Sequence, residues 1–104
     1  MATSKEYLNF ILEQLSDLEN ITYRAMMGEY ILYDRGKIIA YLCDNRLLVK
    51  PVKAVLERMS EAVMEPPYEG AKPMVRVDEV DNKAFLTELF LAVYDQLPQP
   101  KKKK

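Results

Sequence analysis

The chain has 104 residues, of which 49% are hydrophobic and 30% are charged, a composition typical of one globular domain with its own core. No run approaches the roughly 20 apolar residues that a membrane-spanning helix needs, and the N-terminal MATSKEYLNF does not have the pattern of a secretory signal. The single cysteine, Cys43, excludes an internal disulfide, so a cytoplasmic location is expected.

The net charge of −1 hides an uneven distribution. Residues 101–104 supply four of the fifteen basic residues, which leaves eleven against sixteen acidic residues and gives the remaining body a charge of −5. Residues 21–53, with six basic and three acidic residues, carry +3. Binding to a phosphate backbone depends on summed lysine and arginine contacts, so the acidic body makes direct binding of nucleic acid unlikely.

The N-terminal segment is predicted to form a helix of about four turns that ends near Asn20. Thr3 and Glu6 have the spacing of a capping box, with Thr3 as the N-cap. The apolar residues that follow recur every three or four positions, as one helix face requires: Tyr7, Leu8, Ile11, Leu12, Leu15 and Leu18.

From residue 21 the apolar period changes to two, which predicts strands. Gly28 interrupts the first strand, and EYILYD begins the second. DRGK contains Gly36 for a turn with positive φ, and Asp44 with Asn45 form a second tight turn. KIIAYLC is apolar on both faces, as in a central strand, and RLLVK returns from it. The sequence therefore predicts an antiparallel meander of three or four strands.

The second half of the chain predicts two more helices and one or two further strands. Pro51 suits the first position of a middle helix, and Asp81 suits the N-cap of the last one. The apolar stripe of the middle helix is Val52, Val55, Leu56, Met59 and Val63. The fold class is then α+β, a two-layer arrangement of an antiparallel sheet with helices at the N-terminus, middle and C-terminus. We expect residues 1–98 to form a single domain and residues 99–104 to be a disordered lysine-rich tail.

The residue inventory argues against an enzyme. There is no histidine, and three glycines cannot build a phosphate-binding loop. We therefore expect no catalytic residues, no cofactor and no metal site. Cys43 is interpreted as a buried apolar residue rather than a reactive thiol. Met26 and Met27 are interpreted as core filler, with a soft binding surface as the alternative. The tyrosines are expected to pack across strands rather than stack on bases.

Two basic residues, Arg24 and Lys50, lie within the apolar strand pattern and allow two interpretations. Both point away from the larger apolar set of their own strands. If that side faces solvent, they are ordinary surface charges. If they converge with Glu29 or Asp44, they form a polar cluster able to bind a carboxylate or an acidic segment of a partner.

The order of residues from 23 to 73 resembles the N-terminal domain of the TfoX/Sxy family, bacterial regulators of natural competence. The likeness extends from residue 5 to about residue 97, with Met27 in place of the usual phenylalanine. The residues that carry it are Arg24, Met26, Met27, Gly28, Tyr33, Gly36, Asp44, Lys50, Pro51, Tyr68, Gly70, Lys72 and Pro73. The resemblance implies a helix-flanked antiparallel sheet similar to secretion-chaperone-like folds. It also implies a regulatory role, without catalysis, alongside the transcription machinery.

The first functional hypothesis is therefore a TfoX-like module that regulates transcription or competence by binding another protein or a second copy of itself. The residues expected at the binding surface are Arg24, Gly28, Arg46, Lys50, Tyr68 and Lys72. The alternative is a domain that binds a small ligand or an anion on the Arg24 and Lys50 face. Direct DNA binding is the weaker third hypothesis.

Overall fold

The computed structural model describes residues 3–59 and 63–97, and the expected tail at 99–104 lies outside these residues. Over these described residues the fold is α+β, as the sequence predicted, with three helices and one six-stranded antiparallel sheet. The helices are α1 (Lys5–Gln14), α2 (Lys53–Arg58) and α3 (Lys83–Gln96). The strands are β1 (Ile21–Met26), β2 (Glu29–Asp34), β3 (Lys37–Cys43), β4 (Arg46–Val49), β5 (Met64–Glu65) and β6 (Met74–Val77).

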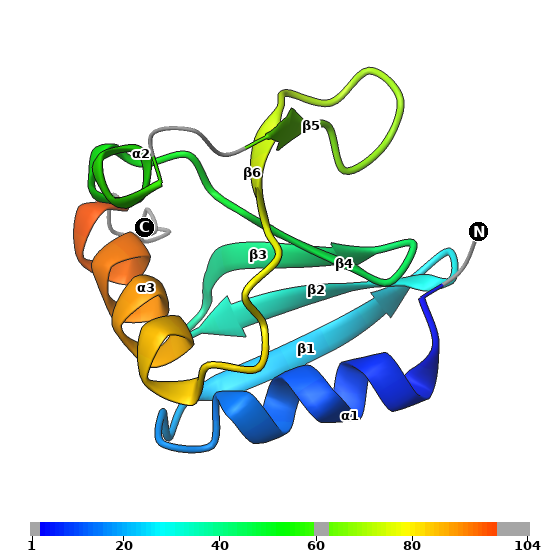
Figure 1. Cartoon of the computed structure of the whole chain (residues 1–104). Coiled ribbons are helices and arrows are strands. Elements are labelled where there is room, and N and C mark those ends of the chain that lie inside the picture. Colours follow the sequence, from blue (N-terminus) through cyan, green and yellow to red (C-terminus); the bar gives the residue numbers. More distant parts are fainter. Residues whose placement is uncertain (1–2, 60–62, 98–104) are drawn as a thin grey trace, which may run out of the picture.

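The first four strands form a meander, and β6 and β5 extend it in the order β1-β2-β3-β4-β6-β5 (Figure 1). Each meander turn has two residues with positive φ: Met27 and Gly28, Arg35 and Gly36, Asp44 and Asn45. Such turns match the twist of the strands they join. The break predicted at Gly28 is therefore a full hairpin turn, in which Gly28 has φ +87° and takes that conformation without a Cβ clash.

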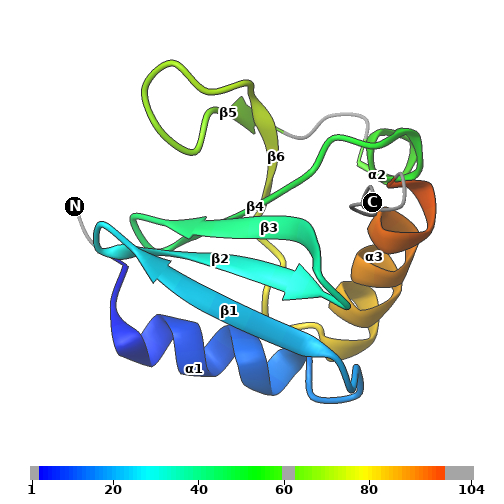
Figure 2. The same cartoon turned by 180° about the vertical axis from the view of Figure 1, so that it is seen from behind.

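One face of the sheet, the inner face, packs on all three helices. Its central row runs from Tyr23 through Leu32, Ala40 and Val49 to Val75, each opposite the next in the ladder. The helix residues buried against this side are Leu8, Ile11, Leu15, Val55, Leu86, Leu89, Phe90 and Val93. Figure 2 shows α1 and α3 on the side of the meander away from the β5–β6 connection. One continuous core thus lies between the sheet and the helices.

The opposite side, the outer face, carries the alternate residues of the same strands. One row consists of Arg24, Ile31, Tyr41, Leu48 and Arg76, and Met26, Glu29, Cys43 and Arg46 lie in the next row towards the β1–β2 turn. A second, small buried cluster of Cys43, Leu48 and Met74 lies on this face with Tyr41 against it. The outer face is thus partly apolar, but the three helices do not cover it.

The N-terminal cap differs from the prediction by one residue. Ser4, not Thr3, is the N-cap of α1, and its side chain accepts from the backbone N–H of Tyr7 at 3.0 Å. Thr3 is buried instead, with its hydroxyl 2.7 Å from a carboxylate oxygen of Glu29. Its backbone N–H also donates to the carbonyl of Gly28 at 3.0 Å. Thr3 therefore ties the N-terminus to the β1–β2 hairpin, a long-range contact that the local capping pattern could not reveal.

The cap of the last helix also moves by one residue. Asn82, not Asp81, accepts from the N–H of Phe85 at 3.1 Å. The helix α1 is shorter than the predicted four turns, since it ends at Gln14 and is followed by a turn.

The middle helix was predicted too long at both ends. Pro51 precedes the N-cap, which is Val52, so it is not the first helical residue. Val63 lies outside α2, and its carbonyl accepts from the N–H of Arg76 at 2.9 Å as the chain enters β5. Leu56 is exposed, while Val55 is fully buried. The apolar spacing extended past the helix because Val63 belongs to a different element.

A buried lysine fixes the end of α3 on the sheet. The Nζ of Lys37, a residue only 6% exposed, donates to the carbonyls of Tyr94 at 3.2 Å and Leu97 at 2.9 Å. The guanidinium of Arg35 lies 3.8 Å from the centroid of the Tyr94 ring, and that arginine pairs with the buried Asp34. Cationic groups favour the carbonyl end of a helix, so Lys37 completes bonds that the helix itself cannot make.

Candidate functional site

The connection between β5 and β6 forms a lid over part of the outer face. Residues 66–73 leave the sheet on the side opposite α1, as Figures 1 and 2 show. The ring of Tyr68 lies 6.4 Å from that of Tyr41 in the middle of the outer face. This segment contains three of the six prolines, which restrict its backbone. The lid and the sheet together enclose two adjoining hollows.

The first, the cationic hollow, brings together three of the residues predicted to bind. Lys50, Tyr68 and Lys72 line a cavity of about 280 Å³. The other lining residues are Tyr41, Pro51, Pro67, Ala71, Pro73 and Met74. Two ammonium groups beside aromatic rings and a proline-rich wall can receive a carboxylate attached to an apolar group.

The second, the apolar hollow, lies beside the first and shares Tyr41, Pro67 and Tyr68 with it. Its volume is about 230 Å³. The remaining lining residues are Met26, Met27, Glu29, Ile31 and Cys43. Methionine side chains adapt to ligands of different shape, so this cavity suits an aliphatic or aromatic side chain.

The interpretation of Met26 and Met27 as core filler is wrong. Met26 is 40% exposed and Met27 is 97% exposed, both at the tip of the β1–β2 hairpin. The alternative of a soft surface agrees with their place beside the apolar hollow. The sequence did indicate this exposure, because Met27 precedes Gly28 in a tight turn and turn residues point away from the core.

The other three predicted binding residues lie on or near the same face, but outside the cationic hollow. Arg24 is exposed on β1, opposite Ile31 of the apolar hollow. Gly28 forms the hairpin turn next to Met27. Arg46 lies at the start of β4, where its guanidinium pairs with Glu65 at 2.9 Å and with Asp44 at 3.3 Å. Arg46 is therefore already engaged, in contrast to Arg24 and Lys50.

Arg24 and Lys50 do not converge with Glu29 or Asp44. Glu29 accepts from the hydroxyl of Thr3 and from the backbone N–H of Asp44, and the Asp44 carboxylate pairs with Arg46. Among the described residues, neither Arg24 nor Lys50 makes an ion pair, and Lys72 makes none either. The geometry therefore agrees with the first interpretation, in which Arg24 and Lys50 are charges on a solvent-facing side. Arg24, Lys50 and Lys72 all lie on the outer face.

Cys43 lies at the floor of the apolar hollow and is 7% exposed. Burial, followed by the nearby Glu29 carboxylate, raises the pKa of its thiol to about 11. The thiol therefore stays protonated at neutral pH and is a poor nucleophile. The same burial raises the pKa of the Tyr41 hydroxyl, so the wall shared by the two hollows is uncharged.

No metal-binding geometry occurs in residues 3–59 and 63–97, since no three His, Cys, Asp or Glu residues gather there as ligands. In that part of the chain, no helix has the length and apolar content to cross a membrane.

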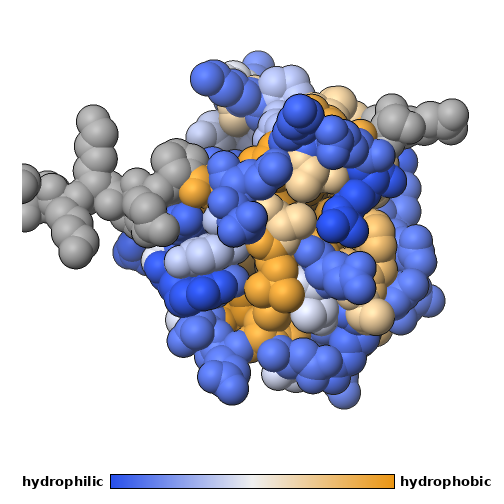
Figure 3. Space-filling view, turned by 90° about the vertical axis from the view of Figure 1, so that its left-hand side faces the viewer, coloured by the Kyte–Doolittle hydropathy of each residue, from blue (hydrophilic) through white to orange (hydrophobic). Residues whose placement is uncertain are grey.

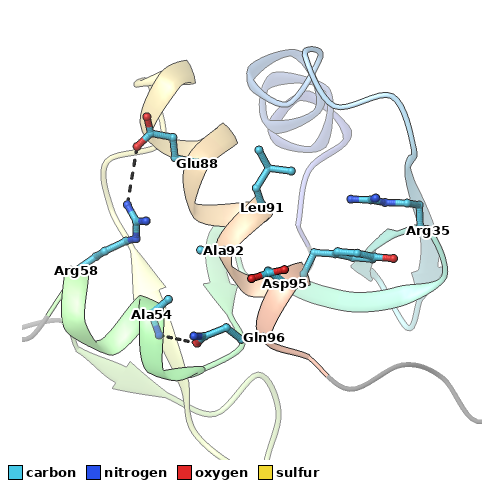
Figure 4. A pocket seen from close by; sticks show the side chains of 9 residues that line it. Arg35, Ala54, Arg58, Glu88, Leu91, Ala92, Asp95 and Gln96 are labelled. Carbon is cyan, nitrogen blue, oxygen red and sulfur yellow. Dashed lines mark hydrogen bonds and ion pairs between the residues drawn. The ribbon is translucent and has the colours of Figure 1, made fainter.

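A larger hollow, which the sequence did not predict, lies between α2 and α3. Figure 3 shows hydrophobic residues on that side with hydrophilic ones around them, and the cavity has a volume of about 630 Å³. Figure 4 shows two polar contacts within its lining: Arg58 reaches Glu88 at 3.8 Å, and Gln96 accepts from the N–H of Ala54 at 2.7 Å. In the sequence, this hollow is indicated only by Leu91, an apolar residue outside the buried stripe of α3 that the structure leaves exposed. The polar groups of this hollow connect α2 to α3, so the hollow is a weaker candidate for ligand binding than the outer face.

The chain is similar to a known protein family and to a bacterial protein of similar length. The TfoX N-terminal domain matches residues 13–89, which include β1 to β6 and the first half of α3. An uncharacterized 12.7 kDa protein in the trpE 5′ region of Spirochaeta aurantia is 35% identical over 105 residues. That match spans all of this chain and 91% of the relative. The matched region contains both hollows of the outer face.

Proposed function

Since the chain belongs to the TfoX N-terminal domain family, we propose that it is a regulatory module of transcription or competence that binds another protein and catalyses no reaction. Its partner belongs to the transcription machinery, and the module works in the cytoplasm. The absence of histidine from the sequence and the protonated, buried Cys43 support a role without catalysis.

The observation that carries the proposal is the pairing of a cationic and an apolar hollow on one face. Tyr41, Pro67 and Tyr68 form the wall that both cavities share. A ligand that fills both must carry an acidic group next to a large apolar group. An acidic segment of a protein with a leucine or aromatic anchor has this chemistry. Lys50 and Lys72, which make no ion pair with any described residue, are placed to contact its carboxylate.

The test is capture of partners by the purified domain carrying Lys50→Glu and Lys72→Glu together. Reversing both charges should remove the partners that wild type retains, because the ammonium groups then become carboxylates facing an acidic segment. Lys53→Glu is the control, since this exposed lysine on α2 has the same charge but lies outside both hollows. Retention of every partner by the double variant, with its fold intact, would contradict the proposed surface.

A second candidate, a small-anion binder, is favoured by one observation. The cationic hollow alone offers two lysines and two tyrosines within about 280 Å³. A metabolite that binds there should raise the melting temperature of wild type and leave that of the Lys50→Glu and Lys72→Glu variant unchanged. A protein-binding module shows no such shift with free carboxylic acids or phosphate.

Direct DNA binding is the third candidate, and the body charge of −5 argues against it. A retarded duplex band that disappears steeply as salt rises would support DNA binding over both other functions.

A further inference from the structure

The two edges of the sheet are protected very differently. At one edge, β5 has two residues and is followed directly by Pro66 and Pro67. At the other, β1 has six residues, no proline, no break in its register with β2, and one charged side chain, Arg24. Five of its six residues are exposed. Short strands, prolines and bulges are how sheets avoid edge pairing, and β1 has none of these features.

The direction of the free backbone groups on β1 follows from its hairpin. Met26 and Glu29 flank the two-residue turn, and flanking residues of this kind direct their N–H and C=O groups at each other. By alternation, Arg24 and Thr22 also direct theirs to β2. Tyr23 and Ala25 therefore direct theirs to the open edge, where no described strand pairs with them.

We propose that the β1 edge binds a second copy of this chain, with the two β1 strands antiparallel and Tyr23 opposite its own copy on the two-fold axis. The result is one continuous sheet of twelve strands in which α1 of each chain lies on the same side. This interface is separate from the outer-face hollows of the proposed function.

The residue pattern of β1 selects this register. An axis at Arg24 also overlaps five residues, but it places two guanidinium groups directly opposite each other, which destabilises a strand pair. Axes at Thr22 or Ala25 overlap three residues of β1 at most. The axis at Tyr23 overlaps residues 21–25 of both chains and places each Arg24 opposite a threonine hydroxyl, so it combines the longest ladder with no like-charge contact.

The surroundings of Tyr23 fit an apolar contact. Its ring is 42% exposed on the inner face and meets Tyr30 edge-on at 5.8 Å. Beside it, a hollow of about 410 Å³ lies between the end of α1 and the start of β1, with few polar atoms in its lining. The lining residues are Leu12, Leu15, Ser16, Leu18, Ile21, Thr22 and Tyr23. In the Tyr23 register, residue 25 of the second copy lies opposite Ile21 and covers the rim of this hollow.

The first measurement is the mass of the wild-type domain by sedimentation equilibrium across micromolar to millimolar concentration. A reversible monomer–dimer equilibrium is expected. A monomer throughout overturns the proposal, and so does a dimer that survives all of the β1 changes below.

Ala25→Pro removes an N–H that faces the open edge, so it should leave β2 paired and weaken the dimer at least tenfold. Ala25→Val, which keeps the N–H, is the matched control and should dimerise like wild type. Circular dichroism checks that both variants are folded.

Tyr23→Glu and Tyr23→Lys provide the test of register, and they keep every backbone group. Each variant alone should be monomeric, because identical charges meet on the axis. An equimolar mixture should dimerise again, because glutamate then faces lysine. A mixture that stays monomeric overturns the Tyr23 pairing, as does a variant that dimerises alone. An extended peptide of another protein on this edge would show neither self-association nor rescue by mixing.

Discussion

The two faces of the sheet are built from alternate residues of the same strands, yet they are covered by different parts of the chain. On the inner face, Leu47 and Val49 of β4 contact a core closed by three helices. On the outer face, Leu48 lies between them in sequence and is equally buried, but its cover is the small cluster with Cys43 and Met74. Burial alone therefore does not distinguish the faces; the nature of the covering segment does.

The difference shows how a small domain can leave part of its sheet free for binding. A helix-covered face loses its apolar surface to the core, whereas the proline-restricted segment 66–73 covers the outer face only in part and leaves two hollows. Three cations that make no ion pair with any described residue, Arg24, Lys50 and Lys72, lie on this outer face. The inner face supplies stability, and the proposed function assigns recognition to the outer face.

Neighbouring leucines of β4 test this comparison with the largest expected effect. Leu47→Ala should lower the free energy of unfolding by about 3–5 kcal/mol, because the helices around it cannot collapse into the space. Leu48→Ala should cost about 2 kcal/mol, because the 66–73 segment can move towards the sheet. Urea denaturation measures both, and equal losses would contradict the difference in cover.

Cys43 tests how closed the outer face is at its centre. With a native pKa of about 11, its reaction with iodoacetamide at pH 8 should be roughly a hundredfold slower than in the urea-unfolded chain, whose thiol has an ordinary pKa. The native fold favours the protonated thiol, because the pKa of Cys43 is higher in the native than in the unfolded chain. This contribution to the free energy of unfolding is fully present below the pKa of the unfolded thiol and is lost as the pH rises towards 11. Equal labelling rates in both states would show that the hollow is open to its floor.

Lys37 tests a polar contact that holds the helical layer on the sheet. Lys37→Met keeps the buried stem but leaves the carbonyls of Tyr94 and Leu97 without their donor, so the unfolding free energy should fall by about 1–3 kcal/mol. Faster amide exchange should be confined to the last turn of α3. An unchanged stability would mean that water replaces the ammonium group without cost.

The N-cap of α3 contributes less to stability, and the neighbouring residues Asn82 and Asp81 allow a matched comparison. Asn82→Ala should cost about 1 kcal/mol, because the N–H of Phe85 loses its acceptor. Asp81→Ala, one residue earlier, should cost less than about 0.5 kcal/mol, as expected of an exposed side chain outside the cap. A larger loss of stability for Asp81→Ala than for Asn82→Ala would show that Asp81 is the N-cap, as the sequence predicted.

Arg24 has the smallest expected effect on stability. Arg24→Ala should change the unfolding free energy by less than about 0.5 kcal/mol, since the side chain is exposed and makes no ion pair among the described residues. A larger loss would place Arg24 in the structural part of the molecule rather than at the binding face.

The fold was predictable because its signals are local and repeated. Alternation identified the strands, and positive-φ residues at Gly36 and Asp44 located two turns. The cap was wrongly assigned to Thr3 instead of Ser4, because the Thr3 hydroxyl donates to Glu29, which is distant in sequence. The length of α2 was missed because apolar spacing continued into Val63, which precedes β5.

The candidate site was predictable in part, for a different reason. Lys50 was identified from its place in the strand pattern, and Tyr68 and Lys72 from the family resemblance; the structure places all three around one hollow. Their meeting depends on how β4 and the 66–73 segment pack, and spacing carries no information about that contact. The place of Met26 at the adjoining cavity was missed because apolar residues are assigned to a core by default.

The most direct test of the account is to select peptides on the immobilised domain by display and to map the bound peptide by amide chemical shifts. The account predicts sequences that combine an acidic residue with a leucine or aromatic residue. The shifts should concentrate at Lys50, Tyr68, Lys72 and Met26, and they should vanish in the Lys50→Glu and Lys72→Glu variant. Selected peptides without acidic residues, or shifts centred on the hollow between α2 and α3, would contradict it.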